Sequence, residues 1–287
     1  MVNGQITKYL FPYQSFPDTY SLQSVEDYAA WVRKQFKMAE EGKSRDAVLE
    51  MRDLCYGSIR DLKVRVRKGE CLVIQDLDNS MMEDLILLLR GAEPESGQLL
   101  LENRKYSYEE GRKIGVIQEL PLDSMLFPHM SYMDNLCFSM DHRIKKIWIS
   151  KGIRKSIIDE YSSLLGEDVF YKKVSELTRK QKYDLIYTRI LLQNPKVVFC
   201  VQPFKSAEVS IRSHIWELME RFLDKGISVV ILAVNLADSL ALADRLIRVK
   251  HGKVQEVYDK KEFIKLPMNT PWLYLYQEKY ALERNME

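Results

Sequence analysis

The chain has 287 residues, of which 46% are hydrophobic and 29% are charged, and its net charge at pH 7 is +2. This composition is typical of a globular protein with a substantial core, and the small net charge gives no reason to expect a nucleic-acid partner. The sequence has no apolar run of the roughly 18 residues that a membrane-spanning helix needs, and its four cysteines and four histidines show no metal-ligand spacing, which favours buried free thiols and no bound metal.

Residues 1–47 form a predicted extension ahead of the main domain. Residues 1–20 are rich in aromatic side chains and include Pro12 and Pro17, which indicates an irregular connector. Residues 22–41 repeat apolar side chains at helical spacing, which predicts an amphipathic helix. The N-terminus lacks the basic start and long apolar stretch of a signal peptide, so we expect a cytoplasmic protein.

Residues 48–260 carry the pattern of one α/β domain. Its first part predicts strands over 48–57, 62–75, 98–103 and 115–119, and a helix from Ser80 to Arg90. A mostly helical block is predicted over 141–194, with a basic stretch near its start that is read either as a solvated face or as a contact for anionic lipid.

The last part of this domain alternates strand and helix. Strands are predicted over 196–203 and 227–234, and helices over 209–226 and 236–246. Such alternation predicts parallel strands joined by crossover helices. A hairpin around Gly252 follows, and residues 261–287 form a tail that we expect to bind a partner.

Residues 68–91, KGECLVIQDLDNSMMEDLILLLRG, have the frame of a phosphate-binding loop without its chemistry. A buried strand, a polar loop and a helix follow one another, as in Gly-x-x-x-x-Gly-Lys-Ser/Thr, where glycines let the backbone wrap phosphate and the lysine and hydroxyl serve phosphate and magnesium. The loop here has no glycine, no lysine and four acids, Asp76, Asp78, Glu83 and Asp84. One like-charge contact at 4 Å costs roughly 1–4 kcal/mol, so several carboxylates would oppose a bound phosphate.

The same loop has a structural interpretation. Ser80-Met81-Met82-Glu83 has the spacing of a capping box, in which the serine and the glutamate satisfy free N–H groups at the start of a helix. Acids in a first helical turn are also stabilising. We therefore predict that Ser80 and Glu83 cap the helix, and that side chains occupy the place of a phosphate.

The order of several frame segments resembles that of a known family. The segments are LCYG, KGE, SGQLLLEN, IGVIQE, LFPHMSYMDNL, NPKVVF and LALADRLIRVKHGKV. They are similar to the ATP-binding subunits of ABC transporters, most of all to the second cassette of the double-cassette ATPases of ribose- or galactose-type sugar importers. The start, MVNGQITKYLFP, resembles the linker between the two cassettes of that family. The resemblance implies an ABC-type P-loop NTPase fold over 48–260, with a mixed β subdomain, a parallel core sheet and a helical insert.

The resemblance also assigns family roles to single positions, and most of the family's chemistry is missing there. Met82 takes the place of the phosphate-loop lysine and Glu83 that of the magnesium hydroxyl, while Val201 and Gln202 replace the magnesium-binding aspartate and the catalytic glutamate. Without these groups, we expect no ATP hydrolysis, no ATP or only weakly bound ATP, and no magnesium. The cofactor-binding positions carried over, in this degenerate form, are Tyr56, Asn79, Ser80, Met82, Glu83, Gln118, Thr178 and Gln202.

Three of these positions keep two interpretations. Thr178-Arg179-Lys180 replaces the middle of the signature LSGGQ, and it is either a solvated basic helix start or an altered phosphate cap for a partner cassette. Tyr56 is either a packing residue of a β-rich stretch or the aromatic that stacks on adenine. Gln118 is either a polar strand end or the glutamine that opens the permease-docking segment 118–138.

The resemblance implies a degenerate cassette of a sugar-type ABC importer, peripheral on the inner face of the cell membrane. Its expected partners are a complete ABC ATPase cassette subunit and ABC permease subunits. Two alternatives remain open from the sequence: a regulatory or interaction protein derived from a cassette, and an active ATPase with displaced catalytic residues.

Overall fold

The computed structural model of this chain describes residues 46–107, 113–138, 151–205, 207–236 and 238–266. The helix predicted at 22–41 and most of the tail at 261–287 lie outside these residues.

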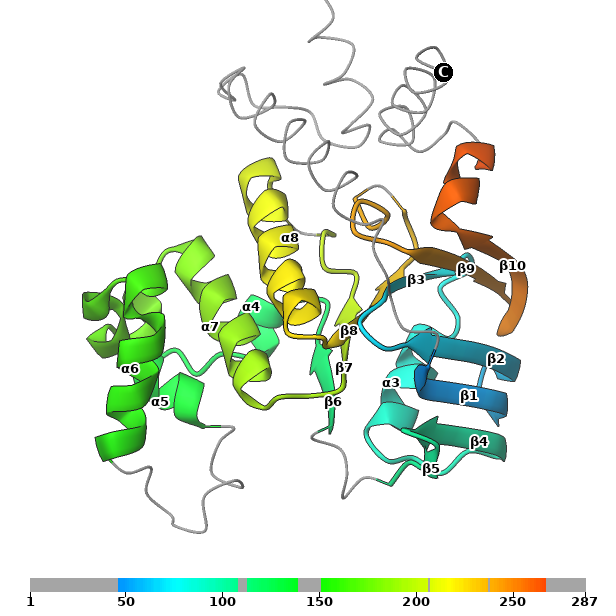
Figure 1. Cartoon of the computed structure of the whole chain (residues 1–287), viewed down its shortest axis with the longest axis horizontal. Helices are drawn as coiled ribbons and strands as arrows, with labels where there is room; N and C mark the ends of the chain where they lie inside the picture. Colours follow the sequence, from blue (N-terminus) through cyan, green and yellow to red (C-terminus); the bar gives the residue numbers. More distant parts are fainter. Residues whose placement is uncertain (1–45, 108–112, 139–150, 206, 237, 267–287) are drawn as a thin grey trace, which may run out of the picture.

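The described elements fall into a strand-rich part, a helical part and an alternating part (Figure 1). The strands are β1 Ala47–Tyr56, β2 Ile59–Arg67, β3 Cys71–Asp76, β4 Ser96–Leu101, β5 Arg104–Lys105, β6 Ile114–Ile117, β7 Val197–Val201, β8 Ser228–Ala233, β9 Arg245–Lys250 and β10 Lys253–Asp259. The helices are α3 Met82–Leu89, α4 Pro121–Ser124, α5 Tyr132–Cys137, α6 Lys151–Leu165, α7 Arg179–Leu192 and α8 Val209–Asp224, with short 3-10 turns at Glu167–Tyr171, Val174–Glu176 and Lys260–Lys265.

The strands form two sheets of different kinds. The four-stranded sheet has the order β2-β1-β4-β5, and all its neighbours are antiparallel. The six-stranded sheet has the order β10-β9-β3-β8-β7-β6, parallel throughout except for the hairpin of β9 and β10. The predicted α/β class, with a mixed β region and a parallel core sheet, is confirmed.

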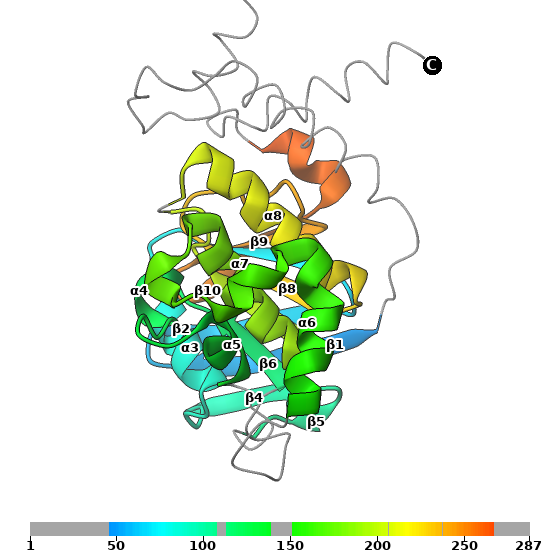
Figure 2. The ribbon, with the colours of Figure 1, turned by 90° about the vertical axis from the view of Figure 1, so that its left-hand side faces the viewer.

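Strands β3, β7 and β8 of the six-stranded sheet are buried on both faces, which explains why they read as largely unbroken apolar runs. On β3, Cys71 and Val73 pack toward the helical side, whereas Leu72 and Ile74 pack toward the antiparallel sheet. Figure 1 shows α7 and α8 on one side of this sheet and α3 with the antiparallel sheet on the other, and in Figure 2 the helices α6, α7 and α8 stand in front of the sheets. The parallel sheet is therefore the middle layer, between the helices α7 and α8 on one side and α3 with the antiparallel sheet on the other.

The helix predicted over 236–246 is wrong. The described residues between β8 and β9 form turns, and β9 already begins at Arg245. Leu240, Ala241, Leu242 and Ala243 are consecutive and all buried, so the segment has no solvent-facing side that a surface helix would have. Its backbone is instead held from α8, where the Trp216 indole donates to the Asp238 carbonyl at 3.1 Å.

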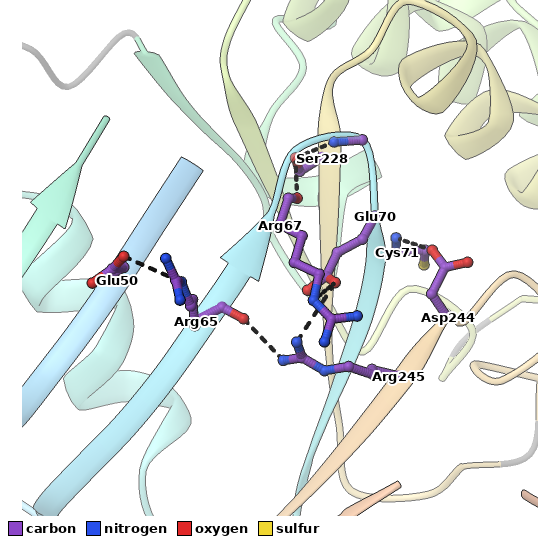
Figure 3. Close-up of polar contacts among 9 residues, drawn as sticks. Glu50, Arg65, Arg67, Glu70, Cys71, Ser228, Asp244 and Arg245 are labelled. Carbon is purple, nitrogen blue, oxygen red and sulfur yellow. Dashed lines mark hydrogen bonds and ion pairs between the residues drawn. The ribbon is translucent and has the colours of Figure 1, made fainter. Parts of the chain in front are cut away.

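A polar cluster joins the antiparallel sheet to the parallel sheet (Figure 3). The side chain of Glu70 is 1% exposed, and its Oε2 lies 3.7 Å from Arg245 Nη1, whose side chain is 8% exposed. Arg245 also donates to the Arg65 carbonyl at 2.9 Å, and Ser228 Oγ donates to the Arg67 carbonyl at 2.9 Å. Burial raises the pKa of Glu70, against the attraction of Arg245.

All four cysteines are free thiols; Cys71, Cys137 and Cys200 are buried as expected, whereas Cys55 is only partly buried. Among the described residues, no helix combines the length and the apolar character that crossing a membrane requires.

Candidate functional site

The side chain of Asp78 holds the loop between β3 and α3 in place through hydrogen bonds. Asp78 Oδ2 accepts the His251 backbone N–H at 2.9 Å and lies 2.7 Å from the His251 ring nitrogen Nδ1, and the Ser80 hydroxyl donates to Asp78 Oδ1 at 3.0 Å. Although desolvation opposes it, hydrogen bonds from His251 and Ser80 lower the pKa of Asp78. The loop is thus anchored to the β9–β10 turn by groups that would repel a phosphate.

The capping box predicted at the start of α3 is not present. The N-cap residue is Met81, and neither Ser80 nor Glu83 caps the helix with its side chain. The buried Asp76 accepts the Met81 N–H instead, with Oδ2 at 2.8 Å. The prediction failed because this cap comes from the strand end five residues earlier, outside the local spacing that defines a capping box.

Replacing Asp76 with alanine is expected to lower the free energy of unfolding by about 1–3 kcal/mol, because the Met81 N–H loses its acceptor. Asp76→Asn keeps an acceptor and removes the charge. Ser80→Ala should change the free energy by less than about 0.5 kcal/mol. Urea unfolding of the three variants checks this order, and a larger loss for Ser80→Ala than for Asp76→Ala would restore the capping box.

The same variants have a defined pH dependence. Burial raises the pKa of Asp76, so the folded state keeps this proton at pH values where the unfolded chain has released it. The contribution of Asp76 is therefore fully present below its unfolded pKa and is lost as the pH rises through its folded pKa. The stability of Asp76→Asn relative to wild type should rise over that interval.

Asp84 ties the first turn of α3 to the β1–β2 turn. Its Oδ2 accepts the Ser58 N–H at 2.6 Å. Gly57 in that turn has φ of +54°, and a Cβ there would stand 2.5 Å from the same carboxylate oxygen. Glycine is therefore required by both the backbone conformation and the approach of Asp84.

The end of β7 carries an amide where the resembling family has acids. Val201 is buried at the end of the strand, and Gln202 follows with a positive φ of 42°. Gln202 Nε2 donates to Glu119 Oε2 at 3.1 Å, and the other oxygen of Glu119 pairs with Lys205 Nζ at 2.5 Å. The strand end is a neutralised polar cluster with its carboxylate already engaged.

These three regions surround a cavity of about 650 Å³. Six of the eight predicted positions line it: Asn79, Ser80, Met82, Glu83, Gln118 and Gln202. The other lining residues are Ser58, Asp84, Ile86, Leu87, Arg90, Val116, Glu119 and Val201. The fold therefore brings together most of the positions that the resemblance selected.

The remaining two predicted positions lie elsewhere. Tyr56 is half-buried and packs against the apolar core under the antiparallel sheet, as the packing interpretation predicted. Thr178 is the N-cap of α7: its hydroxyl accepts the Gln181 N–H at 3.3 Å, and Gln181 Oε1 accepts the Thr178 N–H at 2.9 Å. Arg179 next to it pairs with Glu208 at 3.3 Å.

The sequence reasoning missed Glu119 and Arg90 as cavity residues. Glu119 follows Gln118 just past β6, which pairs in parallel with β7. Because the carboxyl ends of parallel strands meet at one edge, this order could have placed Glu119 beside Gln202. Arg90 follows Glu83 by seven residues, which is two helical turns, and that spacing could have placed it on the same face.

The cavity lining carries more acidic than basic side chains. It holds three carboxylates, Glu83, Asp84 and Glu119, and no lysine. No group of three or more histidine, cysteine, aspartate or glutamate side chains in the described part of the chain could hold a metal ion. The N–H of Met81 at the helix start, where a phosphate would bind, is already paired with Asp76.

The arrangement of the two sheets, α3 and the helical part defines a class: this chain has the fold of ABC transporter ATP-binding cassettes. Among solved structures, cbiO1 from Clostridium perfringens, part of an ABC transporter complex, matches with a TM-score of 0.65 and 20% identity, over 77% of this chain and 92% of that one. The cassette MJ1267 in its ADP conformation matches with a TM-score of 0.66 and 17% identity, over 80% of this chain and 98% of that one.

Sequence comparison gives homologues of the same class. The glycine betaine/proline betaine transport ATP-binding protein ProV of Escherichia coli K12 is 25% identical over 244 residues, 83% of this chain and 60% of ProV. The sn-glycerol-3-phosphate import ATP-binding protein UgpC of Vibrio vulnificus is 22% identical over 220 residues, 75% of this chain and 57% of UgpC. The chain thus spans about 60% of the length of such relatives. No protein-family model matches it.

Proposed function

We propose that this chain is a degenerate cassette subunit of an ABC importer, which docks on a permease and pairs with a complete cassette without hydrolysing ATP itself. The observation that carries the proposal is the combination of a cassette fold with a cavity that lacks the phosphate-binding and hydrolytic groups. Met82 and Glu83 occupy the first turn of α3, and Val201 and Gln202 occupy the end of β7.

Residues 118–138, which follow β6, support a docking role. Asn135 is fully buried, and its amide accepts the Phe127 N–H at 2.8 Å and donates to the Phe127 carbonyl at 3.0 Å. Arg189 on α7 donates to the Met125 carbonyl at 2.5 Å. This rigid support presents the exposed rings of Phe127 and Phe138, whose centroids lie 4.5 Å apart, and such an apolar surface suits contact with a permease.

The geometry gives little support to an active ATPase with displaced residues. Glu119 is the carboxylate nearest to a useful position, beside Gln202. It is engaged by both Gln202 and Lys205, and the cation that lines the cavity is Arg90, at the far end of α3. A general base must be free to accept a proton from a bound water, which this pair of contacts opposes.

The sugar-type assignment belongs to this proposal and rests on the frame segments of the sequence. The names of the relatives describe transport of betaine, polyamines, glycerol-3-phosphate and sulfate. The transported substrate is therefore the part of the proposal to test first in cells that carry the permease.

The decisive experiment is co-expression of the chain with a complete cassette and permease from the same genome, followed by ATPase and uptake assays. Gln202→Glu should leave the ATPase rate within about twofold, because Val201 and Met82 remain unsuited to magnesium and phosphate. Charge reversal at Arg179 and Lys180 should change the rate if α7 contacts the partner's nucleotide. Assembly and uptake that are normal without this chain would overturn the proposal and favour a regulatory role.

A further inference from the structure

The cavity beside α3 combines the size of a small-molecule site with a mixed apolar and acidic lining. Its volume of about 650 Å³ falls in the range of roughly 300–1,000 Å³ typical of small-molecule pockets. One wall is apolar, formed by Met82, Ile86 and Leu87 of α3 together with Val116 and Val201 at the strand ends. Leu87 is 45% exposed, so part of this wall faces the opening without cover from the described residues.

The charge of the cavity is opposite to what ATP needs. Asp84 is held by the Ser58 N–H, and Glu119 is held by Lys205 and Gln202. Glu83 lines the same cavity and has no hydrogen bond or ion pair through its side chain in the described part of the chain. Arg90 is seven residues farther along, about 10 Å down the helix axis, so its charge acts weakly at the Glu83 end.

We propose that this cavity binds a small organic cation, with an ammonium group beside Glu83 and an apolar body against Met82, Ile86 and Leu87. An inorganic cation is a poorer match, because five of the fourteen lining residues are apolar and the described residues offer no cluster of metal ligands. An anion is opposed by three carboxylates. The inference rests on the proposed function only in that the cavity does not hold a nucleotide.

Three probes of one size and different charge test the proposal by ligand-observed NMR titration of the whole chain: tryptamine, tryptophol and indole-3-acetate. Tryptamine should bind with a Kd in the low-millimolar range or tighter, at least threefold more tightly than the other two. Its affinity should fall as the salt concentration rises, whereas that of the neutral tryptophol should not.

Matched variants locate the site. Glu83→Gln should weaken tryptamine binding by about two- to fivefold, the effect of one exposed charge pair, and leave tryptophol unchanged. Glu93→Gln removes an acid that is 84% exposed outside the cavity and should leave both affinities unchanged.

The outcomes separate this inference from the proposed function. Equal or tighter binding of indole-3-acetate, an equal loss in both variants, or no binding of any probe at 10 mM would overturn the cation site alone, because transport can still be tested by co-expression. Displacement of tryptamine by Mg-ATP below about 1 mM would overturn the cation site and also the nucleotide-free cavity on which the proposed function depends.

Discussion

Titration of the isolated protein with Mg-ATP is expected to give a Kd weaker than about 1 mM, which corresponds to a binding free energy of less than about 4 kcal/mol. Intact cassettes offset the charge of the triphosphate with a lysine, magnesium and free N–H groups at a helix start. In this chain, the described cavity has no lysine, and the Met81 N–H is paired with Asp76.

The acidic side chains that line the cavity also oppose a bound triphosphate. Glu83, Asp84 and Glu119 line the cavity, and Lys205 offsets the charge of Glu119. A like-charge contact at 4 Å with either of the other two carboxylates costs roughly 1–4 kcal/mol at effective dielectric constants between 80 and 20. The favourable field of one helix N-terminus contributes about 0.5–2 kcal/mol, which is less than two such contacts at the lower dielectric. We therefore expect Mg-ATP to bind only weakly.

Isothermal calorimetry and thermal unfolding measure this directly. At 5 mM Mg-ATP, a Kd of 1 mM or weaker stabilises the folded state by at most about 1 kcal/mol, so Tm should rise by less than about 4 °C. A complete cassette protein in the same buffer provides the positive control. A calorimetric Kd in the low micromolar range would contradict the degenerate reading of the site.

Removing the arginine of the buried polar cluster should have the largest effect on stability. Arg245→Met is expected to lower the free energy of unfolding at pH 8 by about 3–5 kcal/mol, because it leaves the carboxylate of Glu70 buried without its nearest cation. Glu70 lies between the two sheets, and the other cation near it, Arg67, is 3.9 Å away and 41% exposed (Figure 3).

The loss should be smaller at low pH. Burial already raises the pKa of Glu70, and removing Arg245 raises it further. With a raised folded pKa, the contribution of Glu70 is fully present below its unfolded pKa of about 4.3 and is lost as the pH rises through the folded pKa. The destabilisation by Arg245→Met should therefore grow between pH 5 and pH 8.

Two further variants, measured by urea unfolding like Arg245→Met, test whether the loss of stability comes from the unpaired charge of Glu70. Glu70→Gln combined with Arg245→Met should recover part of the loss, because the buried charge is gone. Arg65→Gln removes a 63% exposed arginine of the neighbouring strand that pairs with Glu50, and it should cost less than about 1 kcal/mol. A loss below about 1 kcal/mol for Arg245→Met at pH 8, or an equal loss at pH 5 and pH 8, would contradict the role of Arg245 as the cation that offsets buried Glu70.

Local patterns in the sequence were sufficient for most of the scaffold. The alternating and continuous apolar runs predicted β1, β4, β6, β7, β8 and the hairpin of β9 and β10, since side-chain burial repeats with the period of the strand. The strand predicted over 62–75 is instead two strands, β2 and β3, which lie in different sheets. The absence of the family's lysine, glycines and carboxylates from the matching positions also follows directly from the residue types in the sequence. Neither the apolar pattern nor the residue type at a position depends on contacts with residues that are distant in the sequence.

Tertiary structure decided the parts that depend on contacts between distant residues. The cap of α3 comes from Asp76 instead of Ser80 and Glu83, and Asp78 is held by His251, which is 173 residues away in sequence. The described residues between β8 and β9 form turns, since Leu240 to Ala243 are all buried and the Asp238 carbonyl is held by α8. Glu119 and Arg90 join the cavity only when strand ends and a helix face converge. Propensity and spacing act over a few residues, whereas capping partners, burial and cavity lining are set by packing. The sequence by itself therefore determined most strands and helices and the residue types at the family positions, and the folded chain determined which side chains meet at the cavity.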